Sequence, residues 1–491
     1  MSTELSQDQQ HKKVQFTRAM SLVDATAVVV GSMIGSGIFI VSAETARQLG
    51  SPGWLILAWL FAAVLTIAAA LCYSELSAMY PHAGGQYVFL RESYGSLAGF
   101  LYGWTLFMVI QSGTIAAVGV AFAKFLGVFV PVISMKTVFI DVGFWKFTAL
   151  QLVAVILIAF LTAVNCRGIH TAKMIQTVFT ATKVGALALL IILGIASVNK
   201  YFGANVNFAN FWPAQDLSGA PLDGIRLLAV LSLAMVGPLF SSDAWNNITF
   251  AGEEVKDAER TLPRSLALGT LLVGLLYVLT NFIYLFLLPL HGSAAGTTVV
   301  ERGIQFATED RVGTAAAQII FGSAGEFIMA GAIMISTFGC LNGLILAGPR
   351  AYYAMAKDGL FFKSAGELNH VTHVPIFGLV LQGVWACLLA TSGTYSQLLE
   401  YVVFAALLFY VLTVAGLMIL RRTRKDIERP YKVFAYPLMP LFYIIAASAI
   451  MVGQIWLSPK FSGAGLLIIL SGLPAYYLWR SKNRASADNG K

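Results

Sequence analysis

Two stretches of this sequence decide its fold: VVVGSMIGSGIFI at residues 28–40 and LAMVGPLFSSDAWNNITFAGEE at residues 233–254. Each belongs to an apolar run long enough to cross a bilayer as an α-helix, which takes about 20 residues. The first has glycine and serine where a plain membrane anchor would have leucine, and the second has Gly237-Pro238 followed by a polar run. Proline breaks a helix, and broken, polar backbone occurs at membrane depth only where protein or a wet cavity surrounds it. We therefore predict two interrupted transmembrane helices that line a common site.

The composition agrees with a membrane protein. Of the 491 residues, 58% are hydrophobic and 11% are charged, whereas a soluble domain carries about 25% charged residues. Apolar runs of helical length predict an all-α polytopic protein with about twelve transmembrane helices. The expected spans are 22–47, 54–79, 97–123, 147–165, 174–198, 227–250, 266–290, 318–345, 375–391, 397–419, 434–456 and 463–479.

The basic residues predict the orientation in the membrane. If the N-terminus lies in the cytoplasm, most of the 32 Lys and Arg residues fall on the cytoplasmic side, as the positive-inside rule requires. We therefore expect a multi-pass protein of the inner or plasma membrane with both termini in the cytoplasm. The formal charge is +8, but the basic residues are scattered between spans and form no stripe, so no nucleic-acid partner is expected.

The cysteines and the short motifs give no sign of an enzyme. Cys72, Cys166, Cys340 and Cys387 fall in or at the ends of spans without metal-ligand spacing, so neither a disulfide framework nor a metal site is predicted. No HExxH or GxSxG pattern occurs, and we expect no catalytic residues, no enzyme activity and no cofactor.

The two interruptions occupy the first and sixth spans. Broken helices five spans apart match an inverted repeat of five helices plus five, with a binding site near the midplane. We therefore divide the chain into a cytoplasmic tail at 1–20, a first repeat at 21–199, a second repeat at 226–420, a basic cytoplasmic loop with spans eleven and twelve at 421–480, and a cytoplasmic tail at 481–491.

The break in the first span has the chemistry to hold an amino acid. The half-helix that starts near Ser36, Gly37 and Ile38 should present free N–H groups to a carboxylate. The half-helix that ends near Met33 and Ile34 should present free C=O groups to an ammonium. A molecule with both charges a few ångströms apart is an α-amino acid. Two alternatives stay open, since water could satisfy the same backbone groups and the glycines could serve close helix packing.

Longer motifs give the chain a family resemblance. They are GSMIGSGIF at 31–39, YSELSAMYPHAGGQYVFLRESYG at 73–95, FSSDAWNNITFAGEEVKDAERTLPRS at 240–265, RAYYAMAKDGL at 350–360 and the basic loop RRTRKDIERPYKV at 421–433. In this order they resemble the amino acid, polyamine and organocation (APC) superfamily, and within it the L-type amino acid transporters and their bacterial relatives. The resemblance covers nearly the whole chain and implies the LeuT-like fold of that superfamily.

The resemblance also implies the substrate contacts. These come from the first break at Ile34, Gly35, Ser36 and Gly37, and from the second at Phe240, Ser241, Ser242 and Asn246. Phe240 matches the aromatic gate that closes over substrate in the family, although an ordinary packed phenylalanine would look the same. The outer loop at 124–146 contains no cysteine, so we expect no disulfide-linked accessory glycoprotein subunit of the kind that animal L-type members use.

Lys183 is a cation inside the fifth span. Such a residue costs about 2.5 to 3.5 kcal/mol on insertion scales, and it lies too deep in the span for its side chain to reach an interface easily. Gln176, Thr180 and Lys183 share one helical face, which should point the amine at the first break. The resemblance implies the same, because sodium-independent members place a lysine where sodium-coupled relatives bind the ion. We therefore expect a coupling or gating role for Lys183, and transport without sodium.

Asp243 departs from the family pattern, in which a small residue usually stands at this position. It could cap the half-helix that follows the second break. Alternatively its charge could act, either as a ligand of a cationic group in the substrate or as a proton site that takes part in gating.

The other acids near the ends of spans are expected to serve capping, packing or gating. Asp24 should cap the first helix. Glutamates near the cytoplasmic ends of spans could pair with Arg91 and Arg264, namely Glu75, Glu253 and Glu254.

These features predict a secondary active transporter that moves amino acids by alternating access, as a proton symporter or as an amino acid exchanger. Its expected partners are therefore an amino acid, protons and the lipid bilayer. An amine or polyamine permease is the alternative. A non-transporting amino acid sensor is a further alternative, but a large signalling domain would favour it, and the tails at 1–20 and 481–491 are short.

Overall fold

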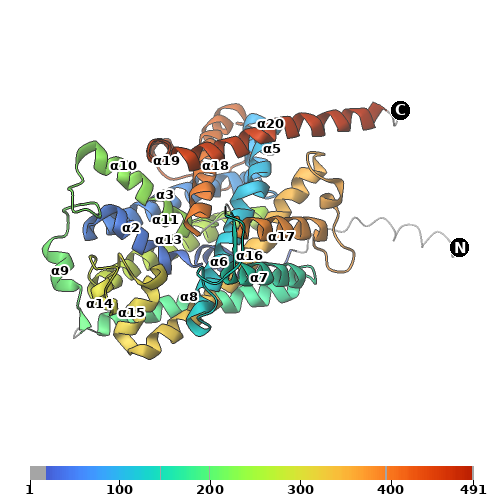
Figure 1. Cartoon of the computed structure of the whole chain (residues 1–491). Helices are drawn as coiled ribbons and strands as arrows, with labels where there is room; N and C mark the ends of the chain where they lie inside the picture. Colours follow the sequence, from blue (N-terminus) through green and yellow to red (C-terminus); the bar gives the residue numbers. More distant parts are fainter. Residues whose placement is uncertain (1–17, 144, 198–199, 393–394, 489–491) are drawn as a thin grey trace.

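The structure is a computed structural model that describes residues 18–143, 145–197, 200–392 and 395–488, without the side chains of 169–177, 396 and 482–488. Its long elements are all α-helices (Figure 1), and ten helical segments are long and apolar enough to cross a membrane. Two shorter apolar helices, α7 (Ala149–Asn165) and α17 (Ile376–Ala390), coincide with the remaining expected spans. The prediction of an all-α polytopic membrane protein is confirmed.

The first half of the chain contains five of the expected spans. These are α1 (Leu22–Met33) with α2 (Gly37–Leu49), α3 (Pro52–Met79), α5 (Ser96–Thr105) with the π-helical turn η1 (Leu106–Ile110) and α6 (Gln111–Phe129), α7, and α8 (Ile169–Ala196), while α4 (Gln86–Tyr94) is a short helix before α5. A two-stranded antiparallel sheet of β1 (Val138–Asp141) and β2 (Lys146–Thr148) lies between α6 and α7. The hydrophobic pattern alone did not reveal this hairpin.

The second half contains the other spans. The sixth consists of α10 (Gly224–Ala234), α11 (Val236–Ser241) and α12 (Asn247–Phe250), and it is followed by α13 (Ala258–Leu287), α16 (Ser323–Lys357), α17, α18 (Tyr395–Thr423), α19 (Leu438–Leu457) and α20 (Pro459–Asp488). The short connecting elements are α9 (Ala204–Ala209), η3 (Gly252–Glu254), α14 (Val299–Arg302), η4 (Thr308–Asp310), α15 (Val312–Phe321) and η5 (Lys363–Gly366).

The first helix begins with a capping box. The Asp24 backbone N–H donates to Ser21 Oγ (3.3 Å), and the Ser21 backbone N–H donates to Asp24 Oδ2 (2.9 Å). These reciprocal bonds satisfy two donors at the start of the helix. The capping role expected for Asp24 is confirmed, with Ser21 as the N-cap residue.

The molecule has two opposite faces to which the spans run. We call the face where α1 begins the terminal face, and the opposite face, which carries α9 and α14, the loop face. Figure 1 shows α9 and α14 on one side of the molecule and the far end of α20 on the other. The interrupted helices lie between these two faces.

Glu75 is the centre of an ionic cluster at the terminal face. Its side chain is buried (0% exposed), and it accepts hydrogen bonds from Arg421 Nε (2.8 Å) and Nη2 (2.5 Å) and from the Val433 backbone N–H (2.8 Å). Arg429 Nε lies 3.5 Å from the same carboxylate. The family motif at 73–95 therefore meets the basic loop at 421–433.

The other acids at this face also have partners that differ from those expected. Glu254 pairs with Arg350 (3.1 Å), and Arg91 pairs with Asp358. Among the described residues, none of the three glutamates pairs with Arg91 or Arg264, so that expectation was wrong. The partners come from helices distant in the sequence, and a single sequence does not reveal which helix ends meet.

Candidate functional site

The first span breaks where the sequence predicts. α1 ends at Met33 and α2 begins at Gly37, with Ser36 as its N-cap residue. Ile34 has an extended conformation (φ −75°, ψ 91°). The first turn of α2 lacks preceding helical carbonyl groups, so its backbone N–H groups are available to another partner.

Lys183 points at this break, as predicted. Its Nζ donates to Gly31 O (2.6 Å) and to Ile34 O (2.9 Å), and the side chain is 1% exposed. Thr180, one turn earlier on the same face of α8, donates to Ala27 O (3.1 Å). The side chain of Gln176, the third residue of that predicted face, lies outside the described residues. These contacts place the charge of Lys183 on the carbonyl end of α1.

The remaining carbonyl groups of the first break are bound by side chains of α13 and α16. Tyr277 Oη donates to Met33 O (3.0 Å), Ser336 Oγ to Ile34 O (3.2 Å), and Cys340 Sγ to Ser32 O (3.1 Å). The expectation of free carbonyl groups near Met33 and Ile34 was therefore wrong. Neighbouring helices supply these donors, and the sequence of the break itself cannot show them.

The second break is longer than the first. α11 ends at Ser241, and α12 begins only at Asn247 with Asn246 as its N-cap residue. Ala244 has a left-handed backbone with φ of 64°. Asp243 therefore does not stand at the N-cap position, and the capping interpretation was wrong. Its Oδ1 instead accepts a hydrogen bond of 2.5 Å from Tyr410 Oη on α18.

The two breaks touch each other at Gly37 and Ser241. A Cβ atom added to Gly37 would lie 2.0 Å from Ser241 Oγ and 2.6 Å from its Cβ, so only glycine fits there. Tyr277 Oη lies 3.0 Å from Met33 O and 3.1 Å from Ser241 O. A single hydroxyl thus faces the carbonyl ends of both half-helices.

A lid of three side chains closes the breaks towards the loop face. Ser36 Oγ and Tyr395 Oη are 3.1 Å apart, and the rings of Phe240 and Tyr395 meet edge to face with their centroids 6.1 Å apart. Beyond this lid a cavity of about 130 Å³ is lined by Tyr395 together with acidic side chains, including Glu44 and Glu400.

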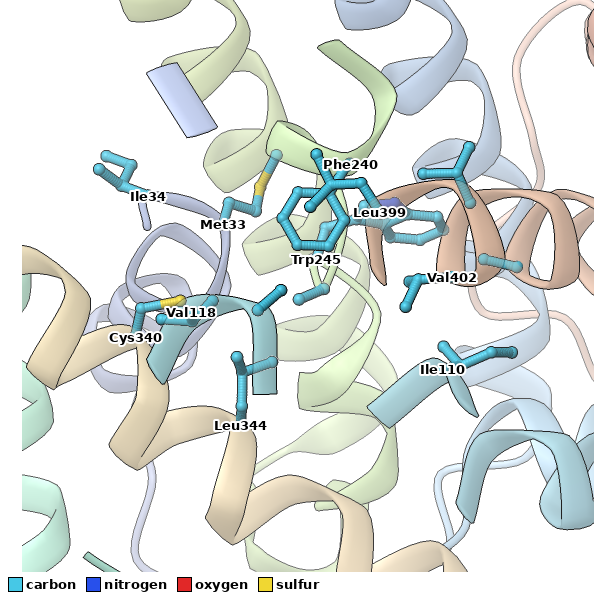
Figure 2. Close-up of a cluster of buried hydrophobic side chains, with 14 of the residues drawn as sticks. Met33, Ile34, Ile110, Val118, Phe240, Trp245, Cys340, Leu344, Leu399 and Val402 are labelled. Atoms are coloured by element: carbon cyan, nitrogen blue, oxygen red, sulfur yellow. The ribbon is translucent and has the colours of Figure 1, made fainter. Parts of the chain in front are cut away.

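The surroundings of the breaks are mostly apolar. Figure 2 shows Met33, Phe240, Cys340 and Val402 gathered around the interrupted segments. Of the predicted contact residues, Ile34 and Ile38 are fully buried, and a Cβ atom at Gly35 would lie 3.2 Å from Cys340 Sγ. The structure therefore brings the first-break residues together, but here they are closely packed against protein.

Asn246 begins a chain of polar contacts. Its Nδ2 donates to Gln86 Oε1 (3.0 Å), and Gln86 Nε2 donates to Thr413 Oγ1 (3.1 Å) on α18. Ser242 and Asp243 line a second small cavity together with Tyr410. Phe240, Ser242 and Asp243 thus lie near α18, and Asn246 reaches it through Gln86. Ser241 instead contacts Gly37 and Tyr277.

α18 contacts the site at successive levels along its length. Tyr395 belongs to the lid, Tyr410 binds Asp243, and Arg421 binds Glu75 at the terminal face. A cavity of about 870 Å³ opens at the terminal face, and its described lining includes none of the predicted site residues.

Sequence reasoning missed several residues of the site. They are Gln86, Tyr277, Ser336, Tyr395 and Tyr410. The available signal was a polar side chain within an apolar span, as in LLYVLTNF at 275–282 and LFYVLT at 408–413. That signal is weak, because tyrosine is common in helices of this kind. The neighbouring residues also do not indicate which distant residue the tyrosine contacts.

A bundle of membrane-crossing helices around two interrupted ones defines a membrane transporter for small molecules. The sequence matches the amino acid permease family over residues 20–473. It is 31% identical over 484 residues to the human large neutral amino acids transporter small subunit 2, covering 97% of this chain and 83% of that protein.

Two further relatives extend the comparison. The serine/threonine exchanger SteT of Bacillus subtilis is 28% identical, covering 94% of this chain and 96% of the relative. The mouse b(0,+)-type amino acid transporter 1 is 27% identical, covering 95% of this chain and 89% of the relative. The chain therefore belongs to the amino acid permease family of the APC superfamily, and it is a multi-pass membrane transporter of amino acids.

Proposed function

We propose that this protein moves amino acids across the plasma or inner membrane by alternating access and without sodium. The observation that carries the proposal is the meeting of two interrupted helices at Gly37 and Ser241. Interrupted helices at midplane present helix ends to a substrate and to coupling ions. The lid of Ser36, Phe240 and Tyr395 supports a site that is closed towards the loop face in this conformation.

The substrate carboxylate would bind the backbone N–H groups of Ser36, Gly37 and Ile38, where the positive end of the α2 dipole favours an anion. The ammonium group has fewer choices, because side chains already bind most carbonyl groups of the first break. It would share Met33 O or Ser241 O with Tyr277. A tyrosine hydroxyl has one proton to donate, so one of these carbonyl groups can receive the ammonium.

Lys183 supports independence from sodium. Unwound carbonyl groups are the usual ligands of sodium in broken-helix transporters. Here the Lys183 ammonium binds Gly31 O and Ile34 O, and a fixed positive charge at that place repels a second cation.

The orientation and internal symmetry are further parts of the proposal. Arginines at the terminal face, among them Arg91, Arg350, Arg421 and Arg429, support a cytoplasmic terminal face by the positive-inside rule. Residues 21–199 and 226–420 would be the two inverted repeats, since each begins with a broken span. The loop at 124–146 has no cysteine, and function without a disulfide-linked accessory subunit is therefore part of the proposal.

The relatives' names support neutral amino acids as the first substrates to test. One relative is named for large neutral amino acids and another as a serine/threonine exchanger. Exchange is therefore one candidate mode, and proton symport is the other. An amine or polyamine permease and a non-transporting sensor are the alternatives that the same experiment can identify.

The test uses purified protein in liposomes preloaded with L-serine or L-leucine. We expect uptake of the labelled amino acid from outside, at equal rates in sodium and in choline chloride. A thermal-shift screen with common amino acids and polyamines identifies the ligand class, because a ligand of the folded state raises its apparent melting temperature. Stabilisation by amino acids without any uptake or exchange would support the sensor, and uptake that stops in choline would refute sodium independence.

A further inference from the structure

Asp243 is a half-buried acid that follows the end of α11, and among the described residues no basic side chain pairs with it. Its carboxylate accepts hydrogen bonds from Tyr410 Oη (2.5 Å) and from the Ala244 backbone N–H. Because Asp243 does not cap α12, this arrangement has no evident role in holding the helix.

The titratable groups that face Asp243 are tyrosines from four different helices: Tyr73 of α3, Tyr102 of α5, Tyr410 of α18 and Tyr443 of α19. Tyr73 also packs edge to face against Trp245, with ring centroids 4.8 Å apart. In the described part of the chain, the titratable side chains around this half-buried carboxylate therefore carry hydroxyl groups and no positive charge, and Tyr410 is the one with a hydrogen bond to it.

Two small cavities adjoin Asp243, and Tyr410 lines both. One, of about 10 Å³, includes Gln86 and Asn246, and the other, of about 20 Å³, includes Thr66 and Ser242. Among the described residues, no lysine, arginine or histidine lines either cavity. A cavity needs about 10 to 15 Å³ to hold one water molecule, so each has room for about one water molecule and not for an organic cation.

We propose that Asp243 is the site that binds and releases a proton during transport. An ionised carboxylate at membrane depth is costly unless a cation neutralises it. A proton can neutralise Asp243, because each cavity has room for about one water molecule that could carry it. A hydronium ion in one cavity would transfer its proton to the carboxylate and leave water, and the reverse transfer would release the proton to water in the other. This inference rests on the proposed function and selects proton coupling for it.

The test follows protons and amino acids in the same liposomes. The pH indicator pyranine is enclosed inside, and L-serine, L-leucine or L-lysine is added outside. We expect the wild-type protein to acidify the interior as the amino acid enters, and Asp243→Asn to show little acidification per amino acid moved. Asp216→Asn, an acid-to-amide change in an exposed turn that binds Ser218 and Arg226, is the matched control and should acidify like the wild type.

Tyr410→Phe provides a second variant that keeps the acid. It removes a hydrogen bond that favours the ionised carboxylate. The pH profile of uptake by this variant should therefore lie at higher pH than the wild-type profile. A merely structural role of Tyr410 would lower the rate without moving the profile. The proposal therefore stays testable even if Asp243→Asn folds poorly.

The outcomes separate this inference from the proposed function. Exchange in preloaded liposomes without acidification by the wild type would overturn the proton site and leave the transporter intact. If, in addition, Asp243→Asn lost L-lysine exchange but kept L-leucine exchange, Asp243 would be a ligand for a cationic substrate side chain. Absence of both exchange and uptake for every amino acid would instead count against the proposed function.

Discussion

The two interrupted helices find hydrogen-bond partners for their breaks in different ways. At the first break, side chains from α8, α13 and α16 donate to the exposed carbonyl groups, and one donor is the charged Lys183. At the second break the backbone is longer, Ala244 is left-handed, and the side-chain donor to the Asp243 carboxylate among the described residues is the uncharged Tyr410. The first break is therefore held from outside by the amine of Lys183, whereas the acid of the second break has no basic partner among the described residues.

The largest effect should come from Lys183→Ala, which removes the charged donor of the first break. Gly31 O would lose its side-chain donor, and Ile34 O would keep only Ser336 Oγ among the described side chains. An unsatisfied buried group costs about 1 to 3 kcal/mol. We expect amino acid uptake to fall to background and the apparent melting temperature to drop. Uptake in proteoliposomes and a thermal melt measure both. Lys200→Ala is the control, since Lys200 binds Ile320 O at an exposed site; normal uptake by Lys183→Ala would contradict the assigned role.

Gly37→Ala should come next, because it tests the point where the breaks meet. The added Cβ would lie within 2.0 Å of Ser241 Oγ, so the half-helices would have to separate and transport should be lost. Gly35→Ala is the milder comparison, with its nearest atom at 3.2 Å. Uptake of both variants is compared at equal membrane abundance. Partial recovery in the double variant Gly37→Ala/Ser241→Gly would identify the contact as the cause, and equal uptake by the two single variants would refute it.

Tyr277→Phe should have an intermediate effect. The variant keeps the edge-to-face packing of the ring against Trp59 (5.5 Å between centroids) but leaves Met33 O or Ser241 O without a donor. One unsatisfied carbonyl group costs about 1 to 3 kcal/mol, so the melting temperature should fall less than in Lys183→Ala. If Tyr277 shares these carbonyl groups with the substrate ammonium, added amino acid should restore more of the melting temperature than it does in the wild type. If the melting temperature and its response to substrate stayed as in the wild type, Tyr277 would have no role in the site.

The smallest effect is expected for Ala244→Gly at the second break. Glycine adopts positive φ without the steric cost that alanine has, but it also gives the unfolded chain more freedom. These terms nearly cancel, and the stability should change by less than about 1 kcal/mol, towards stabilisation. The reverse substitution at the first break, Gly37→Ala, is expected to abolish transport. A thermal melt of Ala244→Gly therefore tests whether the backbone of the second break is less sensitive to such a change. A marked loss of stability would mean that the Ala244 methyl group has a packing role.

Much of the fold followed from the sequence because its signals are local. Among the described residues, apolar runs of helical length marked the ten long apolar helical segments and the two shorter helices α7 and α17. Glycine, proline and polar residues marked both breaks. The ends of α1 and α2 matched at Met33 and Gly37 because helix termination depends on neighbouring residues. The β1–β2 hairpin was missed, since its strands have only four and three residues and β1 is exposed along its whole length, without a buried face.

The site was harder to predict, because its contacts join residues far apart in the chain. Lys183 was assigned to the first break from the high cost of a buried charge, which allows few solutions. Tyr410 has no such constraint, so its bond to Asp243 could not be foreseen, and Asp243 was given a capping role that the delayed start of α12 at Asn247 does not allow. Glu75 was likewise assigned to the wrong arginines, because several basic residues were equally plausible partners.

The length of α18 has a mechanical consequence. Its 29 residues make a rod of about 43 Å at 1.5 Å per residue, with Tyr395 near one end, Tyr410 near the middle and Arg421 near the other end. If the rod rocks about Tyr410 as a rigid body, the swing that draws Tyr395 away from Ser36 carries Arg421 in the opposite direction. The two ends of the helix would then move in opposite directions, and a single tilt could not open the loop face and the terminal face at the same time. Such a linkage would let substrate cross while opposing a continuous leak through the membrane.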